Sequence, residues 1–132
     1  MTQPKSSKDF LNRGISKIEN GAVEEGLEDL NIAIKKDKNN NIAYKRRGIV
    51  RRDTLGDYEG AIEDFNKELR IVNRLAAGKG KRVSRILLDL GITNQLLEKH
   101  QNAIDFFSKA IDIDPQSIQA YKLRGQSKKN ID

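Results

Sequence analysis

The chain contains no cysteine and no tryptophan, and it has only two prolines, Pro4 and Pro115, among its 132 residues. The lack of cysteine excludes a disulfide framework, a thiolate metal site and a cysteine nucleophile. No run of apolar residues is longer than three, so the sequence as written holds no signal peptide and no transmembrane helix, and we expect a cytoplasmic protein. With so few prolines, almost nothing interrupts helices.

Aromatic residues are also scarce, at 5%, whereas charged residues make up 33% of the chain. The core must therefore be aliphatic, thin and spread out, which suits stacked helices better than a globule. The net charge of +6 is unevenly placed: residues 1–40 are neutral, residues 41–83 carry +5, and residues 84–132 carry +1. A solvated surface explains this excess, and so does an acidic partner that docks on the middle of the chain.

Four glycines recur with a regular spacing. Gly14, Gly48, Gly91 and Gly125 are separated by 34, 43 and 34 residues, and each follows a large apolar residue four places earlier. Such a recurrence indicates a repeat protein, in which each unit buries its apolar face against its neighbours. A glycine inside a helix costs about 0.5–1 kcal/mol relative to alanine, so four at one position indicate close packing against a partner helix.

Helical periodicity divides the chain into pairs of amphipathic segments. The pattern predicts helices over residues 7–20 and 23–36, over 42–54 and from 58 onward, and a third pair within 84–115. A single helix is expected at about 118–129. The predicted turns are polar, as at Asn20-Gly21 and Gly56-Asp57.

This pattern resembles the tetratricopeptide repeat, a helix–turn–helix of 34 residues. Each unit shows a large apolar residue, glycine four places on, and then alternating bulky and small residues. The three units carry the motif as Phe10, Gly14, Val23, Gly26, Leu30 and Ala33; as Tyr44, Gly48, Tyr58, Ala61 and Phe65; and as Leu87, Gly91, His100, Ala103, Phe107, Ala110 and Pro115.

The resemblance implies an all-α fold, a right-handed superhelical α-solenoid of three helix pairs plus a C-terminal capping helix. It divides the single domain, residues 7–130, into units at about 7–40, 41–75 and 84–117, an extended joint at 76–83 and a capping helix at 118–130, after a disordered N-terminus at 1–6. Tyr121 and Gly125 are expected to pack inward on the third unit, under a polar outer face. A chain cut from a longer array is the alternative.

Two departures from the motif concern the second unit. About eight extra residues precede the third unit, which resembles the longer variant of the family in which both helices extend. Glu68 occupies a position where a small residue is expected, which implies a locally altered stacking angle between units two and three.

The sequence offers no convincing catalytic or cofactor site. The only histidine, His100, stands at a position that the motif uses for packing, and no cluster of ligands has metal-site spacing. The segment 78–81 has glycines and lysines but lacks the phosphate-loop pattern. We therefore expect no enzyme, no metal and no cofactor.

The resemblance places first helices along a concave groove, which makes the groove the expected binding site. Isoleucine follows the glycine in three units, where the family is commonly polar, so the floor of the groove is apolar and its wall basic. The groove residues implied for partner binding are Leu11, Asn12, Ile15, Lys45, Arg46, Ile49, Arg52, Arg85, Leu88, Asp89 and Ile92.

The function expected from this surface is a non-enzymatic scaffold or adaptor that binds a protein or peptide with apolar and acidic groups. Members that capture acidic chaperone tails use a lysine- and asparagine-based carboxylate clamp, and the matching positions here do not reproduce it, so we expect no such clamp. The alternatives are nucleic-acid binding through the basic middle segment and self-association through an exposed helix face, which would make a homo-oligomer.

Overall fold

A computed structural model describes residues 3–75 and 80–131 of the chain, and all regular structure in these ranges is helical. This confirms the all-α fold class. The helices are α1 (Ser7–Glu19), α2 (Val23–Lys36), α3 (Asn41–Asp53), α4 (Tyr58–Asn73), α5 (Gly80–Leu96), α6 (His100–Ile113) and α7 (Ile118–Lys129).

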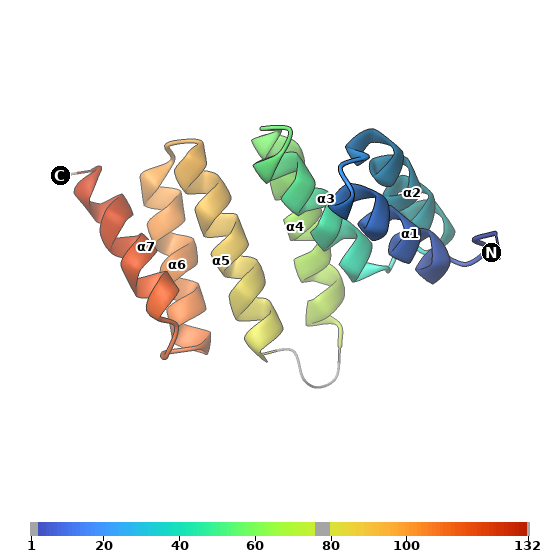
Figure 1. Cartoon of the computed structure of the whole chain (residues 1–132). Coiled ribbons are helices and arrows are strands. Elements are labelled where there is room, and N and C mark those ends of the chain that lie inside the picture. Colours follow the sequence, from blue (N-terminus) through green and yellow to red (C-terminus); the bar gives the residue numbers. More distant parts are fainter. Residues whose placement is uncertain (1–2, 76–79, 132) are drawn as a thin grey trace.

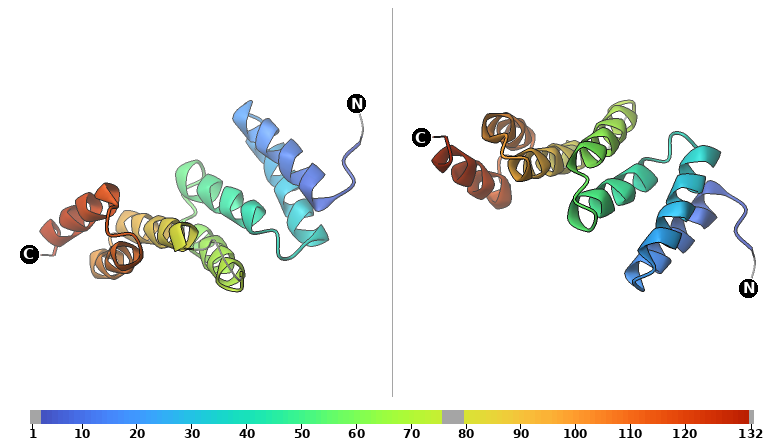
Figure 2. Two further views of the ribbon diagram at one scale, coloured as in Figure 1. Left: turned by 90° about the horizontal axis from the view of Figure 1, so that it is seen from below. Right: turned by 90° about the horizontal axis from the view of Figure 1, so that it is seen from above.

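The helices form three pairs, which we call units one (α1–α2), two (α3–α4) and three (α5–α6), and α7 follows alone at the end of the array (Figure 1). The units stack in chain order, with α2 against α3, α4 against α5, and α6 against α7 (Figure 2). The first helices also touch, α1 with α3 and α5 with α7. The result is the solenoid expected from the repeat, in which each unit contacts only its neighbours.

The repeated glycines allow the two helices of a unit to approach closely. A Cβ added at Gly91 would lie 2.4 Å from Cε1 of Phe107, and one added at Gly48 would lie 2.8 Å from Cε1 of Phe65. Both phenylalanines are fully buried. In unit one the approach is between backbones, since a Cβ on Gly14 would lie 2.9 Å from the carbonyl oxygen of Gly26. The glycines are therefore kept for packing, as their recurrence predicts.

Beside each of the first two glycines, a pair of cations holds a buried aspartate of the second helix. Asp29 is 2% exposed and accepts two bonds from Arg13, at 2.8 and 2.9 Å, while Lys17 Nζ lies 3.0 Å from its Oδ2. The side-chain hydrogen bond from Arg13, followed by Lys17 and both charges, lowers the pKa of Asp29 against the effect of burial.

Unit two repeats this arrangement with Asp64, which is 2% exposed. Arg47 gives it two bonds, at 3.0 and 2.8 Å, and Arg51 gives a third at 3.0 Å. A buried carboxylate with several charge-assisted bonds fixes how the two helices meet, because an unpaired charge there would be costly. The arginine that directly precedes the glycine in units one and two thus has a packing role.

The joint between units two and three is partly helical. The structure ends α4 at Asn73 and begins α5 at Gly80, so residues 80–83 of the expected joint are the first turn of α5. Residues 76–79 and residues 1–2 of the expected disordered N-terminus lie outside the described residues. Ser6 caps α1, because its hydroxyl accepts from Asp9 N–H and the Asp9 carboxylate accepts from the Ser6 N–H.

The inward packing expected of Tyr121 and Gly125 is wrong. Tyr121 is 46% exposed, and a Cβ added at Gly125 would meet no atom of the described residues within 4 Å. The inward face of α7 is instead formed by Ala120 and Ser127, which are fully buried. The physical reason is that the tyrosine and the glycine share the face that a second helix covers in a complete unit, and the described residues supply no such helix to α7.

Candidate functional site

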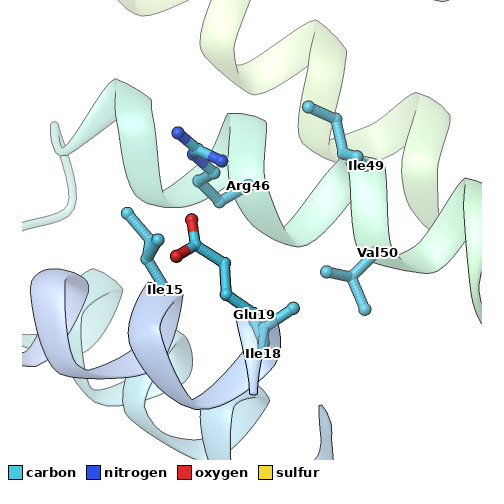
Figure 3. A pocket seen from close by; sticks show the side chains of 6 residues that line it. All are labelled: Ile15, Ile18, Glu19, Arg46, Ile49 and Val50. Atoms are coloured by element: carbon cyan, nitrogen blue, oxygen red, sulfur yellow. The ribbon is translucent and has the colours of Figure 1, made fainter. Parts of the chain in front are cut away.

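An apolar pocket lies between α1 and α3, on the first-helix side of units one and two. Its walls are Ile15 and Ile18 of α1 and Ile49 and Val50 of α3 (Figure 3). Two charged side chains complete its rim, Glu19 and Arg46. The isoleucines that follow Gly14 and Gly48 therefore line the same pocket.

A second, basic pocket lies where units two and three meet. Three helices line it, and the lining includes three cations, one carboxylate and two aliphatic side chains. These residues are Asn41, Ile42 and Lys45 of α3, Glu68 and Val72 of α4, and Arg82 and Arg85 of α5. Helix α3 therefore contributes side chains to both pockets.

Glu68 is the most unusual side chain of the basic pocket. It is 1% exposed, its Oε2 accepts a bond of 2.7 Å from Arg85, and its Oε1 is buried without a hydrogen-bond partner among the described residues. Burial raises the pKa of Glu68 to about 7; the charge and the hydrogen bond of Arg85 oppose this rise, Asp89 adds to it, and Lys45 opposes it. The carboxyl group that occupies the small-residue position of the motif thus gains and loses its proton near neutral pH.

Lys45 faces the same pocket from α3. It is half-buried, and no carboxylate of the described residues lies within ion-pair distance of its ammonium. Burial lowers the pKa of Lys45, and the positive charge of Arg85 adds to this effect. A cation that has lost water without gaining a partner is a favourable place for an anionic group of a ligand.

A chain of ion pairs joins units two and three beside this pocket. Asp89 of α5 receives a bond of 3.0 Å from Arg52 of α3 and one of 2.6 Å from Arg85. Arg52 also binds Asp53 at 2.7 Å and lies over the ring of Phe65. Arg52 and Asp89, both expected to line the groove, are therefore largely engaged with each other.

The remaining expected groove residues are divided between core and surface. Leu11 is 6% exposed and packs in the core with Leu30 and Ala43, so its side chain is not available at a surface. Asn12 is exposed, and Leu88 is half-buried against the core of unit three. Ile92 is half-buried and lines neither pocket.

Sequence reasoning missed several of the lining residues, and it singled out Glu68 only for the stacking of the units. Ile18, Glu19 and Val50 complete the apolar pocket. Ile18 and Glu19 stand one turn after Ile15, and Val50 stands one turn after Arg46, so helical spacing could have shown them. Asn41, Glu68, Val72 and Arg82 complete the basic pocket. Val72 precedes the expected joint at 76–83 and Arg82 lies within it, so the spacing of the repeat does not fix their register.

Neither a metal centre nor a membrane span is found in the described part of the chain. Within residues 3–75 and 80–131, no three histidine or acidic side chains are grouped so as to hold a metal ion. None of the helices in these ranges has both the length and the apolar character needed to cross a bilayer.

Comparison with known proteins agrees with this architecture. The chain is 31% identical over 103 residues to tetratricopeptide repeat protein 36 of Danio rerio. The match covers 77% of this chain and 52% of the relative. It is 29% identical over 118 residues to a TPR repeat-containing protein of Methanocaldococcus jannaschii, covering 88% and 19% of the two chains. The chain thus spans about half of the first relative and a fifth of the second.

A solved structure shares the fold at low sequence identity. The first TPR domain of Spaghetti (RPAP3), bound to the HSP90 peptide SRMEEVD, superposes with a TM-score of 0.80 at 12% identity and covers 98% of this chain and 96% of that one. The family model of the tetratricopeptide repeat matches residues 40–116, which is more than half of the sequence. The chain therefore belongs to the tetratricopeptide repeat family.

Proposed function

We propose that this chain is a non-enzymatic interaction module that binds an extended or helical peptide of another protein along α3. An aliphatic side chain of the peptide enters the apolar pocket, and an acidic group reaches the basic pocket. The observation that supports this most is the half-buried Lys45, which has no ion-pair partner among the described residues and stands one turn from Ile49 of the apolar pocket.

The ion pairs of α3 favour an acidic peptide over nucleic acid as the ligand. Of the five cations on α3, Arg47 and Arg51 are bound to Asp64, and Arg52 to Asp53 and Asp89. Much of the positive charge of the middle segment is thus neutralised within the fold. A few free cations beside an apolar hollow suit one or two carboxylates better than a run of phosphates.

Selection from a random peptide library tests the charge and the place of this site. The wild-type chain is expected to enrich peptides that carry an acidic residue close to an aliphatic one. Lys45→Glu reverses the charge at the centre of the basic pocket and should lower the affinity of the selected peptides at least tenfold, because attraction becomes repulsion. Ile49→Asp should do the same by placing a charge in the apolar pocket.

The matched controls carry the same chemical changes elsewhere. Lys38→Glu alters an exposed lysine of the α2–α3 turn, and Leu55→Asp alters a leucine that is 54% exposed in the α3–α4 turn. Both should leave peptide binding unchanged. Selected peptides without acidic residues, or equal binding to Lys45→Glu and Lys38→Glu, would contradict the proposal, and recovery of RNA in place of peptides would support the nucleic-acid alternative.

A chaperone-tail peptide is expected not to be the ligand. The positions that would form a carboxylate clamp hold Leu11 and Ile15 in α1, Arg46 in α3, and Arg85 and Asp89 in α5, and Asp89 would repel a carboxylate. In calorimetry the SRMEEVD peptide should bind this chain far more weakly than it binds a clamp-bearing TPR domain, which serves as the positive control, because no clamp holds its terminal carboxylates here. Tight, saturable binding would show that the clamp prediction is wrong.

A further inference from the structure

The open face of α7 has the composition of a helix contact. Ile118, Tyr121 and Gly125 share this face, at positions i, i+3 and i+7. Ile118 is 83% exposed and Tyr121 46%, and within residues 3–75 and 80–131 no atom lies within 4 Å of a Cβ built on Gly125. Figure 1 shows α7 at the end of the array, with α6 on one side only.

The equivalent residues of unit three are all covered by its second helix. Ser84, Leu87 and Gly91 stand at the same three positions of α5, and each is buried. The hydroxyl of Ser84 donates to the carbonyl oxygen of Ala110 on α6, at 3.1 Å, and Gly91 receives the ring of Phe107. The face of α7 therefore matches a surface that this chain elsewhere uses to seat a helix.

Two cations on α7 repeat the aspartate-binding pairs of units one and two. Arg124 and Lys128 stand one residue before and three residues after Gly125. Arg13 and Lys17 stand at these positions around the glycine of α1 and bind one buried aspartate of the second helix. Unit two uses two arginines in the same way.

The surroundings of Arg124 reproduce those of Arg47 except for the aspartate. The guanidinium of Arg124 lies 5.3 Å from the centre of the Tyr121 ring, and its Nη1 donates to Ser108 of the preceding second helix at 3.2 Å. Arg47 likewise lies over a tyrosine and donates through Nη1 to Asn31, which is the equivalent of Ser108. Its other nitrogens bind the aspartate of its own second helix.

The cations of α7 lack that last partner. No carboxylate of residues 3–75 or 80–131 lies within ion-pair distance of Arg124 or Lys128. The sequence of α7 contains two lysines and an arginine besides Lys128, and no acidic residue. The helix is thus prepared for an apolar contact and for one carboxylate between its two cations.

We propose that α7 docks an acidic amphipathic helix of a protein partner, which completes a fourth repeat. The helix carries a small residue, an aspartate three residues later and a large apolar residue directly after the aspartate. This is the pattern of Gly26, Asp29 and Leu30 in α2. The aspartate enters between Arg124 and Lys128, and the apolar side chain covers Gly125.

A second copy of this chain is a poor occupant. Its own helices of this pattern, α2 and α4, are already seated with Asp29 and Asp64 buried and bound. Two α7 helices facing each other would bring basic surfaces together, which is repulsive. Dimerisation is therefore kept as an outcome of the test.

A synthetic peptide with the sequence of residues 58–73 serves as the probe, with Glu68→Ala because the equivalent positions of α2 and α6 are Ala33 and Ala110. The full chain, labelled with ¹⁵N, is titrated with this peptide and followed by NMR. We expect shifts at α7 and the adjoining face of α6. A matched peptide with Asp64→Asn should bind about tenfold more weakly, because the charge-assisted bonds are lost.

Two variants of the chain complete the test. Gly125→Leu fills the space over the glycine and should abolish the shifts, while thermal unfolding shows that the fold is kept. Arg124→Gln should lower the affinity for the unmodified peptide about tenfold. It should hardly lower the affinity for the Asp64→Asn peptide any further, because both changes remove the same interaction. The proposal would be overturned if the shifts lay only outside α6 and α7, or if the peptide bound Gly125→Leu as well as the wild type. It would also be overturned if light scattering showed concentration-dependent dimers of the chain that Gly125→Leu prevents.

Discussion

A Glu68→Gln variant is expected to be more stable than the wild-type chain above pH 7, by about 2–3 kcal/mol, and nearly equal to it at pH 4.5. Burial raises the pKa of Glu68 in the folded chain from 4.5 to about 7. Between these two values the folded chain keeps a proton that the unfolded chain releases, so the stability of the wild type falls as the pH rises through this window. Glutamine has the same shape and does not ionise, so the variant escapes this loss.

Urea unfolding of both chains from pH 4.5 to pH 9 measures the difference directly, because the titration of all other groups cancels. The amide oxygen of glutamine can still accept the bond that Arg85 gives to Glu68 at 2.7 Å. Glu63→Gln, on the exposed side of the same helix, is the matched control, and its free energy of unfolding should change with pH as that of the wild type does. A constant offset at every pH would mean that Glu68 acts through packing and not through ionisation.

The sequence allowed the repeat, the helix pairs and half of the apolar pocket to be predicted, for one physical reason. Gly14, Gly48 and Gly91 are placed where two helices cross, so their spacing reports the packing of the whole array. The residue after each glycine turns toward the first-helix side, which is why Ile15 and Ile49 meet as expected. Local spacing suffices for contacts within a unit and between adjacent first helices.

The basic pocket could not be assembled in the same way, because it depends on how unit three sits on unit two. The buried Glu68 and the lengthened joint set that arrangement, and neither has a fixed register in the repeat. Arg52 and Asp89 were both expected to line the groove, and spacing did not show that they bind each other across the two units. Such pairing depends on distances between helices that spacing along the chain does not give.

Replacing the repeated glycines by alanine is expected to have opposite effects in unit three and in α7. At Gly91 the new Cβ would lie 2.4 Å from Cε1 and 2.7 Å from Cδ1 of the fully buried Phe107, so the ring or the helix must move. Overpacking of this kind costs about 1–3 kcal/mol, and the gain in helix propensity of about 0.5–1 kcal/mol offsets only part of it. Gly91→Ala should therefore lower the free energy of unfolding.

At Gly125 the same change meets open space, so only the helix propensity remains and Gly125→Ala should raise the stability of α7 by about 0.5–1 kcal/mol. Chemical denaturation gives the net change for each variant, and amide exchange over α7 shows whether the gain at Gly125 is local to that helix. Destabilisation by Gly125→Ala would mean that a helix already covers this face in solution. The pair of variants thus separates a glycine whose contact is filled from one whose contact is open.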